Sequence, residues 1–178
     1  MSIMRSATER LKLAVRDVPD FPKPGIVFKD ITPLLQDPQL LRLVVTAFAD
    51  RYQRKPVDQI VAIDARGFLL ASALAYVLGT GVSIVRKKGK LPFKTISASY
   101  NLEYGSNTIE MHVDAIKKGQ RVLIIDDVLA TGGTMKATID LVQQLGGNII
   151  ETAFLIELGF LKGRKLIEPT PCFSIITY

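Results

Sequence analysis

The sequence has few of the features that mark secreted, membrane or disulfide-bonded proteins. It contains one cysteine, Cys172, so a disulfide within the chain is excluded and a reducing compartment is favoured. No secretory apolar core follows Met1, and the helical apolar run at residues 68–78 is shorter than the roughly 20 residues of a membrane span. The single histidine, His112, is expected to be structural. The sequence therefore favours a cytoplasmic protein with no membrane partner.

Net positive charge is also small outside one cluster. The net charge is +6, and Arg86-Lys87-Lys88-Gly89-Lys90 holds four cations in five residues. A broad basic face with interleaved aromatic residues, as nucleic-acid binding requires, is absent. We therefore expect no nucleic-acid partner and interpret the cluster as either a local anion site or a solvated loop. The length and the 48% hydrophobic content suit a single domain, residues 1–178.

The most informative stretch runs from Arg121 to Thr134. Residues 122–125 form a continuous aliphatic run, which is typical of a strand buried on both faces of a parallel sheet. The run is expected to end at two carboxylates, Asp126 and Asp127, here called the acid pair. A small-residue segment follows, the phosphate loop, which consists of Ala130, Thr131, Gly132, Gly133 and Thr134. A helical pattern closed by two glycines comes next, so the order is strand, acid pair, loop, helix.

This order suits a sugar phosphate. Gly132 and Gly133 permit close backbone approach, and the loop amides together with the helix N-terminus can hold an anion. Hydrogen bonds to a charged group contribute about 1.5–3 kcal/mol each, so the amides should outweigh the helix dipole. The acid pair would repel a phosphate but can accept hydrogen bonds from hydroxyls or bind a cation. A plain turn with solvated aspartates, or a flavodoxin-like receiver, is the alternative. The lysine-containing Walker loop is absent.

The stretch Val-Leu-Ile-Ile-Asp-Asp-Val-Leu-Ala-Thr-Gly-Gly-Thr resembles the phosphoribosyl pyrophosphate signature of the type I phosphoribosyltransferases, and its ending is most like the adenine-specific branch. The resemblance implies that the phosphate loop holds the 5-phosphate and the acid pair holds the ribose hydroxyls. It also implies an α/β fold, a twisted and mostly parallel sheet with helices on both faces, to which a small N-terminal hood and a flexible β-arm are added.

A second strand-to-helix junction carries further polar residues. Asp64-Ala65-Arg66-Gly67 follows an aliphatic run at residues 60–63 and precedes a helical run, which places it at the ligand edge of an open parallel sheet. Arg66 can fork onto phosphate oxygens, or it can make a surface salt bridge. By the resemblance, Arg66 and Gly67 bind the pyrophosphate leaving group, and a cis peptide is expected at Asp64–Ala65. Arg86, Lys87 and Lys90 are further candidates for pyrophosphate binding.

The hood is predicted at about residues 19–35, after a helix stopped by Pro19. Its prolines are expected to prevent regular structure, and on this basis alone it is a covering loop. The segment resembles the purine-binding hood of the adenine branch, which implies that Val27 and Lys29 line the base site together with Ala130 and Leu158. Lysine stands at position 29 where many members of the branch have arginine.

The arm is predicted at about residues 91–113. Alternating patterns at residues 95–99 and 108–113 indicate two strands, with a polar tip at residues 101–107 that is expected to be mobile. Ala-Ser-Tyr-Asn-Leu-Glu-Tyr-Gly resembles the catalytic flexible loop of the adenine branch. By this match Glu103 is catalytic at the imidazole edge of adenine, and Tyr104 covers the pyrophosphate. Arg66 is the second catalytic candidate.

The function that the resemblance implies is transfer of the phosphoribosyl group from phosphoribosyl pyrophosphate to adenine, giving AMP and pyrophosphate in purine salvage. It further implies Mg²⁺ held mainly by the substrate, with no direct protein ligand, and a homodimer in which Lys87 and Lys90 could act across the interface. Two alternatives stay open. One is the same chemistry on hypoxanthine, guanine or xanthine, and the other is a non-catalytic regulator that senses phosphoribosyl pyrophosphate.

Overall fold

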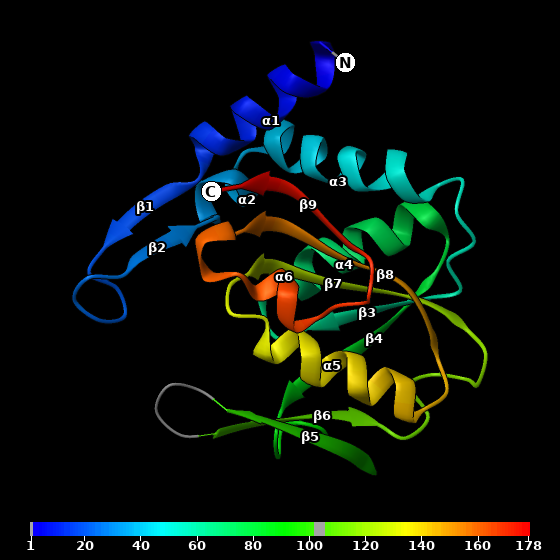
Figure 1. Ribbon diagram of the computed structural model, residues 1–178. Helices are drawn as coiled ribbons and strands as arrows, with labels where there is room; N and C mark the ends of the chain where they lie inside the picture. Colours follow the sequence, from blue (N-terminus) through cyan, green and yellow to red (C-terminus); the bar gives the residue numbers. More distant parts are fainter. Residues whose placement is uncertain (1, 102–105) are drawn as a thin grey trace. The chain divides into compact units, whose positions relative to one another are not determined.

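The computed structural model of the protein describes residues 2–101 and 106–178 (Figure 1). The chain divides into two compact units, Met1–Phe48 and Ala49–Tyr178. The expectation of one domain therefore stays a prediction. No helix in the described ranges is both long and apolar enough to cross a membrane.

The first unit contains a helix, a two-stranded ribbon and a short second helix. Its elements are α1 (Ser2–Ala14), β1 (Arg16–Pro19), β2 (Val27–Asp30) and α2 (Thr32–Gln36), and α3 (Pro38–Tyr52) begins in it. The first helix ends earlier than expected, and β1 pairs antiparallel with β2. The expectation that prolines prevent regular structure was wrong for this ribbon, because Pro22 and Pro24 lie in the connecting loop and leave the second strand free to pair.

The second unit is built on a seven-stranded sheet in the order β5-β6-β4-β3-β7-β8-β9. Its central part is parallel, as predicted, and β5 and β6 are antiparallel additions at one edge. The strands are β3 (Gln59–Ile63), β4 (Gly81–Lys87), β5 (Thr95–Asn101), β6 (Ser106–His112), β7 (Arg121–Leu129), β8 (Asn148–Glu157) and β9 (Cys172–Thr177).

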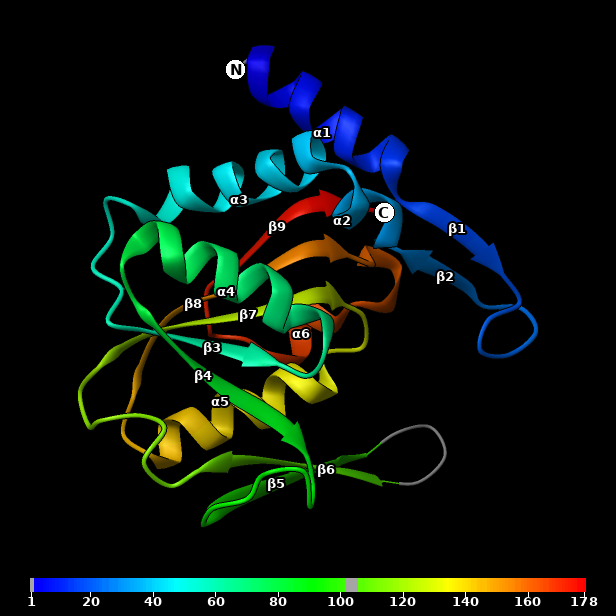
Figure 2. The same cartoon turned by 180° about the vertical axis from the view of Figure 1, so that it is seen from behind.

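The two long helices of this unit cover opposite faces of the sheet. α4 (Arg66–Leu78) lies behind the strands in Figure 1 and in front of them in Figure 2, and α5 (Gly133–Gln144) does the reverse. Aliphatic side chains of both helices and of the central strands form the core, which includes Leu70, Leu74, Ile124, Ile139 and Val142. Two short elements, η1 (Gly159–Leu161) and α6 (Gly163–Leu166), connect β8 to β9.

The central strand is longer than the sequence indicated. β7 continues through Asp126 and Asp127 to Leu129, so the expectation that the strand ends at the acid pair was wrong. β3 pairs with it only as far as Ala62 opposite Ile125, whereas β8 pairs with it as far as Glu157 opposite Leu129. The acid pair therefore lies where β7 extends beyond one of its two neighbours.

Candidate functional site

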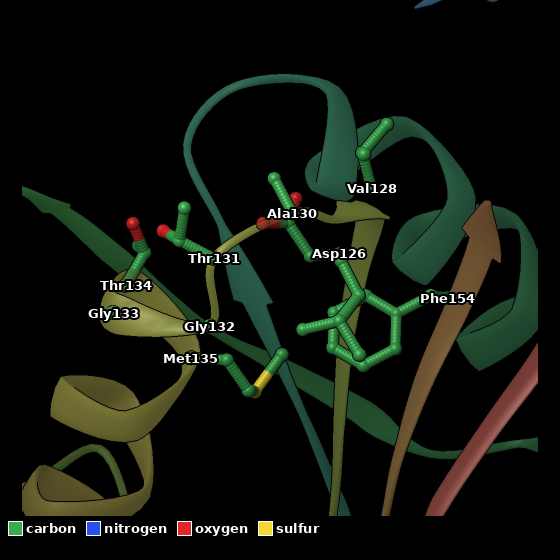
Figure 3. A pocket seen from close by; sticks show the side chains of 10 residues that line it. Asp126, Val128, Ala130, Thr131, Gly132, Gly133, Thr134, Met135 and Phe154 are labelled. Carbon is green, nitrogen blue, oxygen red and sulfur yellow. The ribbon is translucent and has the colours of Figure 1, made fainter. Parts of the chain in front are cut away.

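A small pocket of about 80 Å³ lies at the carboxyl end of β7 (Figure 3). It is formed by the end of the strand, the phosphate loop, the first turn of α5 and one aromatic ring from β8. The lining residues are Asp126, Val128, Leu129, Ala130, Thr131, Gly132, Gly133, Thr134, Met135 and Phe154. All five residues of the phosphate loop thus meet at one pocket with the first member of the acid pair.

The shape of the phosphate loop depends on two glycines. Gly132 has φ +88°, and a Cβ atom there would lie 2.5 Å from the carbonyl oxygen of Gly163. A Cβ on Gly163 would lie 2.1 Å from the carbonyl oxygen of Ala130. The backbone at the start of α6 therefore packs directly against the phosphate loop. Gly163 was not among the predicted site residues, and in the sequence it is only the middle of a polar turn.

The start of α5 suits an anion. The first bond of this helix runs from the Lys136 amide to the Gly132 carbonyl at 2.8 Å, so the preceding amides have no carbonyl within the helix. Within the described ranges no side chain caps this N-terminus. Because Thr131 and Thr134 add hydroxyls to the same pocket, the arrangement can bind a phosphate monoester.

The acid pair is electrostatically unusual. The Asp127 amide donates a hydrogen bond of 2.9 Å to Asp126 Oδ1, and Asp127 Oδ2 lies 2.5 Å from Arg66 Nε in an ion pair. Burial raises the pKa of Asp126 well above its ordinary value, and the neighbouring Asp127 raises it further. Burial also raises the pKa of Asp127, although the Arg66 charge opposes this shift. The Arg66 charge and the local hydrogen bonds therefore do not fully offset the cost of burying these two carboxylates.

The junction before α4 lies against this pair. The Asp64–Ala65 peptide is cis, as expected from the resemblance. Arg66 and Gly67 form the first turn of α4, and a Cβ on Gly67 would lie 3.0 Å from Asp126 Oδ1. Glycine is therefore needed where this helix meets β7. Arg66 does make a salt bridge, but its partner is Asp127, which is only 5% exposed. Its predicted contact with pyrophosphate stays a prediction.

The basic cluster is only partly linked to the site. Arg86 Nε donates to Asp64 Oδ2 at 3.0 Å, which fixes this arginine beside the cis peptide. Its Nη1 donates to the carbonyl oxygen of Lys90 at 3.3 Å. Lys87 ends β4, where it pairs with Ile109 of β6. Neither Lys87 nor Lys90 lines the pocket in the described part of the chain.

The predicted adenine-binding residues fall in different parts of the chain. Ala130 lines the pocket, and the Leu158 amide donates to the Leu129 carbonyl at 2.9 Å, just before the phosphate loop. Val27 and Lys29 belong to β2 of the first unit, where Lys29 Nζ lies 2.5 Å from Asp17 Oδ1. The predicted residues Glu103 and Tyr104 lie outside the described residues.

Several residues of the pocket region besides Gly163 were missed. Val128, Leu129 and Met135 line the pocket but were not among the predicted site residues. Phe154 of β8 lines the pocket, although its sequence context indicates only a buried strand. Tyr100 of β5 accepts a hydrogen bond of 2.9 Å from the Thr134 hydroxyl. The strand alternation of the arm gives no signal for this contact, because the two residues are 34 positions apart.

Comparison with known proteins agrees with this geometry. The profile of the family described as "Phosphoribosyl transferase domain" matches residues 30–177. The chain therefore belongs to the phosphoribosyltransferase family, which the phosphate loop and the acid pair had indicated.

The individual similar proteins are adenine phosphoribosyltransferases. That of Methylacidiphilum infernorum is 52% identical over 176 residues, covering 99% of this chain and 98% of the relative. That of Geobacter metallireducens is 54% identical over 170 residues, covering 96% and 99%. The crystal structure of the Rhodothermus marinus enzyme has a TM-score of 0.94 at 52% identity and covers 98% of this chain and 99% of that one. The Saccharomyces cerevisiae enzyme, complexed with an imino-altritol bisphosphate and adenine, has a TM-score of 0.91 at 40% identity, with coverage of 96% and 99%.

Proposed function

We propose that the protein transfers the 5-phosphoribosyl group from phosphoribosyl pyrophosphate to N9 of adenine, giving AMP and pyrophosphate for purine salvage. The observation that carries this proposal is one pocket in which an uncapped helix N-terminus meets a half-buried carboxylate. A ribose 5-phosphate needs both groups, an amide cradle for its phosphate and an acceptor for its hydroxyls. The full-length similarity to adenine phosphoribosyltransferases supports adenine as the base.

In this proposal the phosphate loop binds the 5-phosphate through its amides and its two threonine hydroxyls. Asp126 and Asp127 accept hydrogen bonds from the ribose hydroxyls. Their negative charge also lies close to the sugar carbon that becomes positively charged when the leaving group departs. The raised pKa of both acids supports this role, because a ligand hydroxyl or a developing positive charge would relieve part of their desolvation.

The reaction forms the bond between adenine N9 and ribose C1′ while the bond from C1′ to the pyrophosphate oxygen breaks. Both electrons of the broken bond leave with pyrophosphate, and the N9 proton of adenine is lost. Catalysis is then mainly positioning and charge stabilisation. We assign Glu103 to the imidazole edge of adenine as hydrogen-bond partner or general acid, and Val27, Lys29, Ala130 and Leu158 to the base.

Arg66, Gly67, Arg86, Lys87, Lys90 and Tyr104 are the proposed pyrophosphate contacts. In this proposal Arg66 turns from Asp127 to the leaving group, and the 35% exposure of its side chain supports this movement. We also propose that magnesium is held mainly by oxygen atoms of the substrate, with no direct ligand from the protein. When bound, it supplies positive charge to the departing pyrophosphate.

The proposal extends to a cytoplasmic homodimer. The one cysteine supports a reducing compartment, and the basic residues at the end of β4 suit an anion shared across an interface. Light scattering of the purified protein at micromolar concentration would report the expected mass of two chains. A single-chain mass with full activity would contradict the dimer without affecting the reaction.

A turnover assay tests the function. The protein, magnesium and phosphoribosyl pyrophosphate should convert adenine to AMP, while hypoxanthine, guanine and xanthine are converted at least about tenfold less efficiently. Preferred use of another base would replace adenine and retain the chemistry. Binding of phosphoribosyl pyrophosphate without turnover of any base would instead indicate a sensor.

Glu103 has its own test. Glu103→Leu should lower kcat by roughly 100-fold or more, because general acid catalysis contributes on this scale. The affinity for phosphoribosyl pyrophosphate should change far less, since the glutamate is assigned to the base. An unchanged kcat would remove Glu103 from the mechanism.

A further inference from the structure

Tyr100 connects the arm to the phosphate loop. It lies near the end of β5, and its hydroxyl accepts a hydrogen bond of 2.9 Å from Thr134 Oγ1. Its ring lies over the start of α5, since a Cβ on Gly133 would be 2.9 Å from the ring atom Cδ2. The side chain is therefore fixed by two independent contacts at adjacent residues, one polar and one steric.

The direction of the polar contact matters for binding. Thr134 lines the pocket, and its hydroxyl has one hydrogen atom, which it donates to Tyr100 in this structure. A fully ionised phosphate monoester in the phosphate loop accepts hydrogen bonds and cannot donate them. Thr134 must therefore turn its hydrogen atom toward the anion, and its oxygen then becomes available as an acceptor for Tyr100.

A phenol suits the reversed arrangement. It is a stronger donor than an alkyl alcohol, and a hydroxyl that accepts one hydrogen bond becomes a better donor in the next. The order from Tyr100 to Thr134 to phosphate would thus strengthen the contact with the anion. The two hydroxyl oxygens are already 2.9 Å apart, so the change requires rotation of the hydrogen atoms and a small adjustment of the angle at the Tyr100 hydroxyl.

We propose that Tyr100 is a positioning residue for the sugar phosphate: its hydroxyl changes from acceptor to donor when a phosphate monoester fills the phosphate loop, and it thereby aims the Thr134 hydroxyl at the anion. This inference rests on the proposed function, because it takes the 5-phosphate as the ligand of the phosphate loop. The inference assigns a part in phosphate binding to Tyr100, a residue of the arm strand β5.

Binding of ribose 5-phosphate to the full chain, measured by titration calorimetry, tests the inference. Tyr100→Phe keeps the ring over Gly133 and removes only the hydroxyl, so we expect affinity to fall about three- to tenfold, the scale of one hydrogen bond. The KM for phosphoribosyl pyrophosphate should rise by a similar factor, and the KM for adenine should not change. Tyr76→Phe is the matched control, because Tyr76 on α4 is 91% exposed.

A double-mutant cycle separates positioning from packing. In a Thr134→Val background, Tyr100→Phe should cause no further loss of ribose 5-phosphate affinity, because the hydroxyl that it aims is gone. Additive losses would overturn the inference, as would an unchanged affinity of Tyr100→Phe or a loss that merely follows a lower Tm. If the wild-type protein binds neither ribose 5-phosphate nor phosphoribosyl pyrophosphate, the proposed function fails first. If the wild-type protein binds and Tyr100→Phe has the same ribose 5-phosphate affinity, the inference is wrong but the proposed function is not affected.

Discussion

The neighbouring strands β7 and β8 both hold buried carboxylates, but the protein treats them in opposite ways. On β8, Glu151 and Glu157 are 5% and 8% exposed, and the pKa of each is lowered. On β7, Asp127 is as little exposed, yet its pKa and that of Asp126 are raised, and burial is the main cause of both shifts. The exposed area alone therefore does not explain the difference, which depends on whether hydrogen bonds offset the cost of burial.

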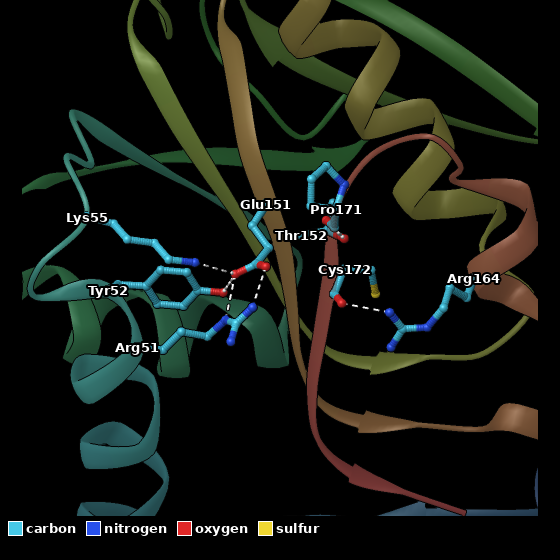
Figure 4. A network of polar contacts seen from close by, with 8 residues as sticks. All are labelled: Arg51, Tyr52, Lys55, Glu151, Thr152, Arg164, Pro171 and Cys172. Atoms are coloured by element: carbon cyan, nitrogen blue, oxygen red, sulfur yellow. Dashed lines mark hydrogen bonds and ion pairs between the residues drawn. The ribbon is translucent and has the colours of Figure 1, made fainter.

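Glu151 is compensated from three side chains (Figure 4). Arg51 donates from Nε and Nη2 to its two oxygens at 2.7 and 2.6 Å, and the Tyr52 hydroxyl donates at 2.7 Å. Lys55 adds a longer contact of 3.4 Å. Burial by itself would raise the pKa of Glu151, but the hydrogen bonds from Arg51 and Tyr52 outweigh it. This carboxylate has no need of a ligand.

Glu157 is compensated in the same way at the other end of β8. Arg164 donates to both of its oxygens, and Ser174 Oγ donates at 2.9 Å. The hydrogen bond from Arg164 is the main cause of its lowered pKa. Since Arg164 also follows Gly163, this pair holds the turn that packs against the phosphate loop. The two glutamates of β8 thus stabilise the fold, whereas the acid pair of β7 is available to a ligand.

The largest effect on stability is expected at Glu151. Glu151→Gln removes the charge that Arg51 and Lys55 face, and we expect the free energy of unfolding to fall by about 2–3 kcal/mol, or roughly 4–12 °C in Tm. Chemical denaturation measures the change. Glu9→Gln, at an exposed position on α1, is the control.

The same variant should bind ribose 5-phosphate normally at a temperature where it is folded. An unchanged Tm together with lost ribose 5-phosphate binding would mean that Glu151 acts in the binding site. The assignment of structural acids to β8 and ligand-binding acids to β7 would then be wrong.

A smaller and more local effect is expected at Gly163. Gly163→Ala places a Cβ atom 2.1 Å from the Ala130 carbonyl oxygen, so the phosphate loop must move. We expect the affinity for phosphoribosyl pyrophosphate to fall at least about tenfold, because small displacements of binding groups are costly. The control is Gly159→Ala, where the nearest atom would be 3.3 Å away. Equal affinity in both variants would show that the loop does not depend on this contact.

The order strand, acid pair, loop and helix was predictable because every signal for it is local. An aliphatic run, two glycines and a helical period lie within about two dozen residues, and each has its own physical meaning. The family resemblance extended this reading to the fold, which the parallel sheet and the two flanking helices confirm. The end of β7 was misjudged because polar side chains say nothing about backbone pairing, which β8 continues through Asp126 and Asp127.

The missed residues share a different cause. Gly163 and Tyr100 reach the phosphate loop only through tertiary packing, across 31 and 34 positions from Gly132 and Thr134 respectively. A single glycine in a polar turn and a single tyrosine in an alternating strand have many ordinary explanations. The compensation of Glu151 is likewise invisible in the sequence, since Arg51 and Glu151 are 100 positions apart.

The acid pair offers a test with the opposite sign. Folding raises the pKa of Asp126 from 3.8, so ionisation of its carboxyl costs stability as the pH rises through the folded-state pKa. Asp126→Asn removes this cost, and we expect Tm at pH 7 to rise by roughly 2–6 °C while ribose 5-phosphate affinity falls. The gain should shrink as the pH falls below the raised folded-state pKa, and it should be gone below about pH 4. A lower Tm at pH 7 would mean that the charged carboxylate stabilises the empty protein.

The smallest effect is expected for a carboxylate that is paired but exposed. Arg121 donates to Asp58 from its side chain and its backbone, which lowers the pKa of Asp58 from 3.8 to about 2. Because the folded-state pKa is depressed, this pair stabilises the protein above about pH 4, and the contribution is lost as the pH falls toward 2. Solvent screens both groups, so Asp58→Asn should lower Tm at pH 7 by less than Asp126→Asn raises it. Melting curves of the two variants between pH 7 and pH 3 would therefore shift in opposite directions and converge on the wild type in acid. Shifts of the same sign would show that hydrogen-bond pairing does not distinguish a structural acid from one that is available to a ligand.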